Sequence, residues 1–456
     1  MKTNSLEEKR MIETIFVANA AEAFEELLKI GASTERGKTQ IGHELSLSQR
    51  AFFWGADNKA VIAPYQIPQA LMDHNMKACE YSDIVSLSPA VPEINLSNAI
   101  LRDDNLMRCI NDATHGKMFK LSPYAVTDSL IMLMNGLTQR GAKIVLEENP
   151  DPSAFWTVKY LDSKVGFRSE MQKLMAGYDD ILLPKGFVAD SKSQAVDMAE
   201  WFYLQGKSAI LKANYGESGW GLMMLDAKQY VSVMALRECI KMSLAVDPIW
   251  ENTLIVVEEL ITPNVEIAGG SPSSELYVDG SGATVTYHCG QVLDANGGFI
   301  GVEIGKNAVP VSLLDKLERI SAFIGNRYHE IGYRGYFDID FIVGKDECLY
   351  VVETNTRRTG GTHAYNLARH LFGKTWASDA YLLSYDSFRY GREVLNAERL
   401  LEHLRPVLYP IKHQRKGVII TFINPWDPVL GYIIVAEDRK EARYFQRQLS
   451  GLFKAD

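Results

Sequence analysis

The stretch GYFDIDFIVGKDECLYVVETNTRRTGGTH, residues 335–363, decides how the rest of the chain is interpreted. Phe337, Ile339 and Phe341 alternate with Asp338, Asp340 and Ile342, and 349–352 is a second run of β-type residues, so both segments are predicted as strands. The short turn 344–347 joins them into an antiparallel hairpin. Such a hairpin sets Asp340 beside Glu353, and Asn355 and Arg357 continue the face of Glu353.

These side chains are suited to holding a metal ion beside a phosphate. Two carboxylates and an amide oxygen are hard ligands for Mg²⁺, which takes few protein ligands and completes its shell with water and phosphate. We therefore predict metal ligands at Asp340, Glu353 and Asn355. A guanidinium at Arg357 could steady the oxygens of a phosphoryl group in transfer. The alternative is a surface hairpin with solvated carboxylates, but the very apolar strands around the acids favour the metal site.

Two segments further upstream carry features of a phosphate site. Lys164 and Arg168 are four residues apart in a predicted helix and so share one helical face. A predicted strand ending at Lys212 leads into the loop NYGESGWG, residues 214–221, whose glycines are Gly216, Gly219 and Gly221. Glycines free the backbone to turn successive N–H groups toward an anion. Taken alone, the two cations have their usual interpretation as a solvated pair, and an ordinary glycine-rich hairpin explains the loop about as well as a phosphate site. Together with the acidic hairpin, these features favour the phosphate site.

The acid on one strand and the E-x-N-x-R pattern ending the next resemble the metal-binding core of ATP-grasp ligases. The resemblance implies that Asp340, Glu353 and Asn355 hold Mg²⁺ and that Arg357 faces the transferred phosphate. It also implies that Lys164 and Lys212 contact the nucleotide phosphates. The loop that contains Gly216, Ser218 and Gly219 would close over those phosphates. Within it, Glu217 and Trp220 depart from the small residues often found there.

The same resemblance implies further contacts to ATP and to substrate. Backbone groups around Glu259 and Leu260, beside Glu258 at the end of the apolar run 254–257, would read the adenine edge. Glu266 would take the ribose hydroxyls, and Arg334 would lie near the reacting carboxylate. As bare sequence, each of these glutamates is an ordinary surface carboxylate.

Length and composition limit the class of protein. The 456 residues suffice for two to four domains, and a net charge of −9 argues against a surface that coats nucleic acid. No uninterrupted apolar segment of membrane-spanning length occurs, so we expect no membrane partner. The five cysteines are scattered without C-x-x-C spacing, which is typical of reduced thiols in a cytoplasmic protein.

The predicted fold class is α/β, with an α+β core. Residues 1–150 alternate strands and helices and are predicted as a Rossmann-like domain preceding the core, although no G-x-G-x-x-G is present. Residues 151–376 would form the ATP-grasp core and 377–456 a small C-terminal α/β domain. Near the N-terminus we expect a helix over 6–30, a loop over 32–48 and a strand over 51–55.

The resemblance covers nearly the whole chain and is strongest to the peptide ligase of pheganomycin biosynthesis and its relatives, on the run N-T-R-R-T-G-G-T and the three-part layout. It implies a carboxylate that attacks the γ-phosphate of Mg-ATP to give an acyl phosphate and ADP, followed by attack of an amine. The expected partners are a small-molecule or peptide carboxylate and an amine acceptor, with a homodimer as the candidate assembly. An ATP-dependent kinase or carboxylase, or a non-catalytic nucleotide-binding module, remain as alternatives.

Overall fold

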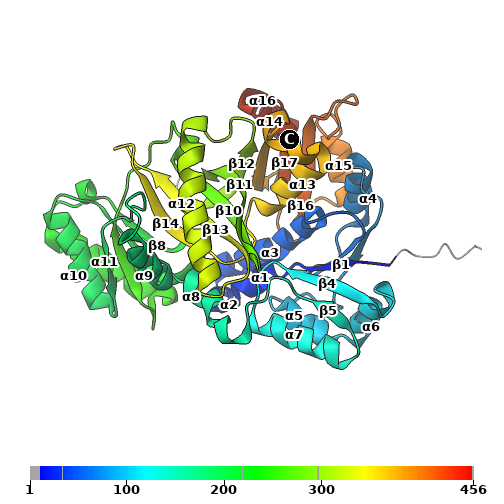
Figure 1. Ribbon diagram of the computed structural model, residues 1–456. Coiled ribbons are helices and arrows are strands. Elements are labelled where there is room, and N and C mark those ends of the chain that lie inside the picture. Colours follow the sequence, from blue (N-terminus) through cyan, green and yellow to red (C-terminus); the bar gives the residue numbers. More distant parts are fainter. Residues whose placement is uncertain (1–10, 33, 218, 295–296, 454–456) are drawn as a thin grey trace, which may run out of the picture.

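The computed structural model describes residues 11–32, 34–217, 219–294 and 297–453, and its helices and strands are arranged around three sheets (Figure 1). Within these residues all five cysteines are free. None of the helices described there combines the length and apolar character needed to cross a membrane. The predicted α/β class with an α+β core is confirmed, because one sheet is parallel and the other two are antiparallel.

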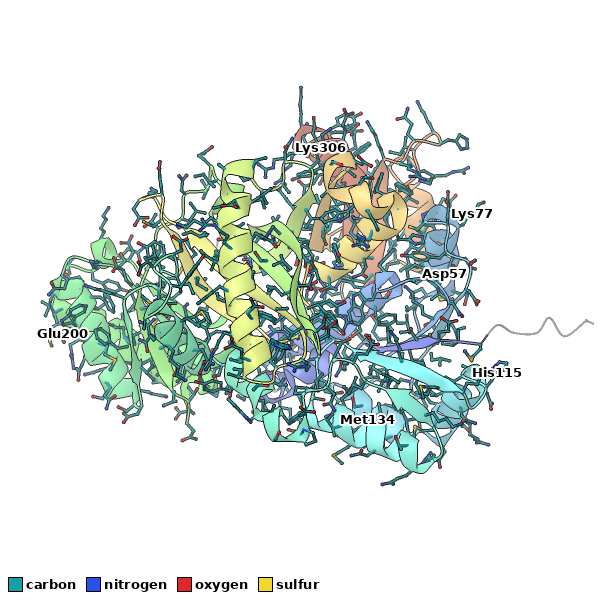
Figure 2. The ribbon with its side chains drawn as sticks, in the orientation of Figure 1. Asp57, Lys77, His115, Met134, Glu200 and Lys306 are labelled. Atoms are coloured by element: carbon teal, nitrogen blue, oxygen red, sulfur yellow. The ribbon has the colours of Figure 1, made fainter. Side chains whose placement is uncertain are left out.

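The first sheet lies at the lower right of Figure 1 and contains only parallel strands, in the order β3-β2-β1-β4-β5. The strands are β1 (Thr14–Val17), β2 (Lys59–Ile62), β3 (Ile84–Leu87), β4 (Met118–Pro123) and β5 (Lys143–Val145). The helices of this region are α1 (Ala20–Ala23), α2 (Glu25–Gly31), α3 (Glu35–Leu47), α4 (Gln69–Ala78), α5 (Leu96–Arg102), α6 (Asp104–Ala113) and α7 (Asp128–Gln139). Helices α5 to α7 pack their apolar sides onto the sheet. In Figure 2, Met134 marks α7 and Asp57 the turn before β2.

Three of the expected elements near the N-terminus differ in the structure. Strand β1 replaces the middle of the helix expected over 6–30, because Ile15, Phe16 and Val17 are buried on both faces of a parallel sheet and so show no alternation. Residues 6–10 of that helix lie outside the described residues. The loop expected over 32–48 is mostly α3, whose first turn is capped by Thr34. The strand expected over 51–55 falls largely in the 3₁₀ helix η1 (Ser48–Phe53), every residue of which is buried.

The second sheet has eight antiparallel strands in the order β14-β13-β10-β11-β12-β15-β17-β16. The strands are β10 (Pro272–Asp279), β11 (Gly282–Leu293), β12 (Phe299–Gly305), β13 (Gly335–Val343), β14 (Leu349–Asn355), β15 (Tyr381–Arg389), β16 (Gly417–Ile423) and β17 (Val429–Ala436). The helices are α12 (Val311–Glu330), α13 (Thr362–Phe372), α14 (Trp376–Asp379), α15 (Ala397–Leu404) and α16 (Arg439–Leu452). Helix α12 crosses β10 and β11 and completes a buried core with them.

The C-terminal segment 377–456 extends the core sheet. Its strands β15, β17 and β16 add to the edge at β12 and form no separate sheet. Their apolar side chains join one core with those of the N-terminal region, in which η1 contacts β16 and Phe52, Phe53 and Ile420 are all buried. The first and last parts of the chain thus pack together at the end of this sheet that is opposite the acidic hairpin.

The third sheet lies at the left of Figure 1, with strands in the order β6-β9-β7-β8. They are β6 (Gly186–Ala189), β7 (Ala209–Glu217), β8 (Trp220–Leu225) and β9 (Ile255–Glu259). Helices α10 (Lys192–Leu204) and α11 (Val233–Val246) cover it, and Glu200 marks α10 at the outer edge in Figure 2. Helices α8 (Trp156–Asp162) and α9 (Lys164–Met175) connect this unit to the first sheet.

Candidate functional site

Strands β13 and β14 form the antiparallel hairpin that the sequence predicts, and its turn pairs Val343 with Leu349 and Phe341 with Val351. Asp340 lies opposite Glu353 and Asp338 opposite Asn355, with a bulge immediately after Asp340. The Asn355 amide donates to Asp338 Oδ1 at 2.9 Å and to Asp340 Oδ2 at 3.4 Å, which leaves its carbonyl oxygen available as a ligand. The hairpin therefore delivers three carboxylates and one amide to the same face of the sheet.

The electrostatics of this face favour a cation. Burial, followed by the charge of Glu353, raises the pKa of Asp340 to about 7. Burial and the charge of Asp340 raise the pKa of Asp338 well above its usual range. Bringing these carboxylates together unprotonated costs free energy that a divalent cation would offset. The described part of the chain holds no cluster of three or more His, Cys, Asp or Glu side chains arranged to bind a metal alone. Two carboxylates and an amide oxygen are ligands suited to Mg²⁺, which takes few protein ligands and completes its shell with phosphate and water.

Two basic side chains face the hairpin acids. Lys164 opens α9 directly after the Ser163 cap, and its Nζ donates to Glu353 Oε1. Burial lowers the pKa of Lys164, but the charge and hydrogen bond of Glu353 raise it overall, so the lysine stays charged. Arg357 is held by Asp162 at 2.7 Å between Nη1 and Oδ1, and its guanidinium lies 4.7 Å from the centre of the Phe24 ring.

A second buried group of charges lies beside the third sheet. Glu258 pairs with Arg168 at 2.7 Å between Oε1 and Nη1, and with Lys212 at 2.7 Å between Oε2 and Nζ. Lys212 Nζ also donates to the Val352 carbonyl at 3.3 Å, which ties β7 to β14. Lys164 and Arg168 do share one buried face of α9, as their spacing predicts. Glu258 thus serves as the counter-ion of two basic residues.

The glycine-rich turn joins β7 to β8. Gly219 and Gly221 have φ of +85° and +86°, a backbone region that favours glycine. Trp220 donates from Nε1 to Asp247 Oδ2 at 3.2 Å and packs so closely on Gly31 that a Cβ there would lie 2.4 Å from the indole ring. The bulky Trp220 therefore holds the turn against α2. Ser218 lies outside the described residues.

A single cavity of about 360 Å³ connects these groups. Among its lining residues are most of those predicted from sequence: Lys164, Lys212, Gly216, Gly219, Glu258, Glu259, Leu260, Asp340, Glu353, Asn355 and Arg357. Glu266 and Arg334 are not among them. Glu266 is exposed on the segment after β9. Arg334 Nη1 donates to the carbonyls of His329 and Tyr333 at the end of α12, at 3.1 and 2.6 Å.

Comparison with known proteins identifies the fold. No protein-family model and no curated protein sequence matches the chain. The biotin carboxylase domain of 2-oxoglutarate carboxylase from Hydrogenobacter thermophilus superposes with a TM-score of 0.51 at 12% identity, covering 96% of this chain and 90% of that chain. N5-carboxyaminoimidazole synthetase from Staphylococcus aureus gives 0.51 at 10% identity, covering 98% and 99%. Biotin carboxylase from Campylobacter jejuni gives 0.50 at 14% identity, covering 94% and 89%.

The chain has the ATP-grasp fold. The likeness extends over nearly the whole of both chains, so it includes the parallel sheet that precedes the ATP-grasp core and the strands that follow it. At these identities the likeness establishes architecture, and the chemistry has to be argued from the residues of the site.

Several residues of the site were not assigned from sequence. Asp338 could have been included, because it shares the parity of Asp340 on β13. Asp162 and Gln291 could not have been assigned to the site from sequence, because they come from segments distant from the hairpin. In the structure, Gln291 Nε2 donates to Asp340 Oδ1 at 2.6 Å, and Asp162 accepts from Arg357 and orients it. Glu275 on β10 is a further buried acid, paired in register with Asp338.

Glu275 offers a test of the buried electrostatics. It accepts hydrogen bonds from the hydroxyls of Thr359 and Thr362, yet burial raises its pKa to about 7 from 4.5. Between pH 4.5 and 7 the native state then holds a proton that the unfolded chain has lost, so stability falls as the pH rises through this window. We expect the free energy of unfolding of the wild type, relative to Glu275→Gln, to fall by about 3 kcal/mol over the window. Urea unfolding of both proteins at pH 4.5, 5.5, 6.5 and 7.5 measures the difference, and a constant difference would contradict the buried, protonated acid.

Proposed function

We propose that the protein is an ATP-dependent, ADP-forming ligase that joins a carboxylate to an amine. The observation that carries the proposal is the register of Asp340 opposite Glu353, with Asn355, Lys164 and Arg357 around them, on the wall of one cavity. Acids at this spacing that face a lysine and an arginine suit phosphoryl transfer, where positioning and charge neutralisation supply most of the catalysis.

The chemical groups that line the cavity indicate which residues would hold the cofactors. Asp340, Glu353 and Asn355 would hold Mg²⁺, which when bound neutralises charge on the phosphates of ATP. Lys212 and the turn with Gly216 and Gly219 would contact the nucleotide phosphates. Backbone groups at Glu259 and Leu260 would read the adenine edge. Glu266 and Arg334, which lie away from the cavity, take no part in the proposed contacts.

The reaction proceeds in two balanced steps. A carboxylate oxygen attacks the γ-phosphorus, forming a C–O–P linkage while the bond to the leaving ADP breaks. The amine then attacks the acyl carbon, the C–O bond breaks, phosphate leaves and the amine loses a proton. Lys164 and Arg357 would offset the charge that develops on the transferred group. Arg357 is already oriented by Asp162, so little side-chain entropy is lost at that stage.

For the substrate class, we propose an amino acid or a peptide, because the run N-T-R-R-T-G-G-T resembles that of the pheganomycin-type peptide ligases. Bicarbonate is the second candidate for the carboxylate. The structure from Hydrogenobacter thermophilus is a biotin carboxylase domain in complex with MgADP and bicarbonate, and it shares this fold. Both candidates use the same first step, so they differ only in the product.

The test is the release of ADP and phosphate with Mg-ATP across a panel of amino acids, short peptides and bicarbonate, with mass spectrometry of the products. We expect one carboxylate and amine pair to release ADP and phosphate together and to yield a product lighter by one water than the sum of its parts. ADP formed with a phosphorylated product and no condensation would favour a kinase. ATP binding without turnover over the panel would favour a non-catalytic module.

A further inference from the structure

A glutamine from a distant strand reaches the hairpin acids. Gln291 lies on β11, two residues after Cys289. Through Ser273 of β10, Cys289 is in register with Asp340 of β13. Residues two apart on a strand point to the same face, so Gln291 and Asp340 lie on one face of the sheet. Both residues line the cavity and are partly exposed, so both are open to what the cavity binds.

The sheet fixes the backbone of this glutamine. Its N–H donates to the Ser271 carbonyl at 3.0 Å, and the residue pairs with Val302 of β12. The side chain then reaches across β10, and Nε2 donates to Asp340 Oδ1 at 2.6 Å. Hydrogen bonds to a charged acceptor are short and strong. Because the backbone of Gln291 is held by its neighbours, this bond limits how the Asp340 carboxylate can turn.

The two oxygens of Asp340 differ in what they bind. Oδ1 is engaged by Gln291, whereas the Asn355 amide lies 3.4 Å from Oδ2. That second distance is beyond the roughly 2.7–3.2 Å of a strong N–H hydrogen bond. Oδ2 is therefore the oxygen of Asp340 that a metal ion can take with the smaller loss of hydrogen bonding.

A carboxylate with one oxygen engaged suits one kind of divalent cation better than another. Mg²⁺ is small, demands octahedral geometry and keeps several waters, so a single oxygen from a carboxylate serves it well. Ca²⁺ takes about six to eight oxygens and often uses both oxygens of one carboxylate. A donor on Oδ1 of Asp340 therefore hinders Ca²⁺ more than Mg²⁺. The donor also holds the ligand in place, and such outer partners are commonly worth about 10- to 100-fold in metal affinity.

We propose that Gln291 is a positioning residue, which acts through Asp340 to favour Mg²⁺ over Ca²⁺ at this site. The inference rests on the proposed function, because it assumes that Asp340 holds the metal that accompanies the nucleotide. The proposed nucleotide contacts at Lys212, Glu259 and Leu260 come from the third sheet and the segment after it. Loss of the Gln291 amide should therefore change the response to metal and leave the binding of the nucleotide itself unchanged.

Two variants remove the bond to Asp340 in different ways. Gln291→Met keeps an unbranched side chain of similar length but has no N–H donor. Gln291→Asn keeps the amide but is shorter by one methylene, so it falls short of Oδ1. The Ser273 hydroxyl, which donates to the Ile339 carbonyl at 3.1 Å, also stabilises the charge of Asp340, so the carboxylate keeps a partner in both variants.

The experiment measures the dissociation constant of ADP by calorimetry with EDTA, with millimolar Mg²⁺ and with millimolar Ca²⁺. The metal–ADP complex in solution is the same for every protein, so a difference between variants reports on the site. We expect the wild type to bind ADP more tightly with Mg²⁺ than with Ca²⁺. Both variants should bind ADP about 10- to 100-fold more weakly with Mg²⁺, because Asp340 is no longer held. Their affinities should stay within about twofold of the wild type with EDTA and within about threefold with Ca²⁺, whose larger and more flexible shell depends less on the orientation of one carboxylate.

The matched control is Gln205→Met, the same change on an exposed residue at the end of α10, outside the cavity. It should leave all three constants as in the wild type. The proposal would be overturned by a wild type with no preference for Mg²⁺, by variants with unchanged Mg-ADP affinity, or by an equal loss under all three conditions, which would indicate a general distortion of the site. A wild type whose ADP affinity does not depend on metal would refute the metal site of the proposed function as well. The expected selectivity without any ADP release over the substrate panel would instead refute the ligase proposal alone.

Discussion

Replacing Glu353 with glutamine should reduce substrate-dependent ADP release by about 10³-fold. Glutamine keeps the shape of the side chain but removes the charge that faces Lys164 and that would hold the metal opposite Asp340. The loss should persist at saturating Mg-ATP and at millimolar Mg²⁺, because the missing interaction acts on charge developing during transfer. Initial rates of ADP release by wild type and variant measure it.

The control for this variant lies in the same hairpin. Glu347 is exposed in the turn between β13 and β14, so Glu347→Gln makes the same chemical change away from the cavity. Its rate should stay within a factor of two of the wild type, because a surface substitution leaves the site intact. Thermal unfolding of both variants separates lost chemistry from lost fold, since Lys164 is buried and loses its partner in Glu353→Gln. A folded Glu353→Gln protein with wild-type turnover would contradict the role of the hairpin.

The hairpin was predictable because its information is local. Alternation along 337–342 indicates which side chains of β13 share a face, and the short turn fixes the pairing of Val343 with Leu349 and of Phe341 with Val351. Continued unchanged, that register would place Asp340 opposite Val352. The bulge after Asp340 shifts the register by one residue and so brings Asp340 opposite Glu353, and nothing in the alternation indicates this bulge. The spacing of Lys164 and Arg168 was equally local, since one helical turn sets it.

The predictions that failed concern elements and site residues that depend on packing between segments far apart in the sequence. Strand β1 is four residues long and lies inside a parallel sheet. Its apolar run therefore does not alternate, and it was predicted as part of a helix. Helix α3 is so polar that its sequence predicts a loop. The Thr34 side chain caps its first turn, and Leu45 is buried in the N-terminal core. The partners of the site, Asp162 and Gln291, come from segments far from the hairpin in sequence, so only the assembled sheets bring them together.

Arg358→Met should lower the free energy of unfolding by about 3 to 5 kcal/mol, because breaking a buried pair leaves a carboxylate in the interior. Arg358 follows Arg357 in sequence but turns away from the cavity. Its guanidinium bonds both oxygens of Glu148 and lies between the rings of Tyr336 and Trp54, 4.2 and 5.3 Å from their centres. Urea unfolding followed by tryptophan fluorescence measures the change.

The double variant distinguishes a lost pair from lost packing. In Arg358→Met with Glu148→Leu neither charge remains, so most of the lost stability should return, since an apolar pair of similar volume often replaces a buried ion pair at little cost. Arg389→Met, which removes an exposed pair with Asp427, should cost less than about 1 kcal/mol. If Arg358→Met proved as mild as Arg389→Met, the buried pair would not be what fastens the segment after β14 to the segment after β5. If the double variant stayed as unstable as the single one, the packing of the guanidinium between two rings would account for the stability, and the pairing of charges would not.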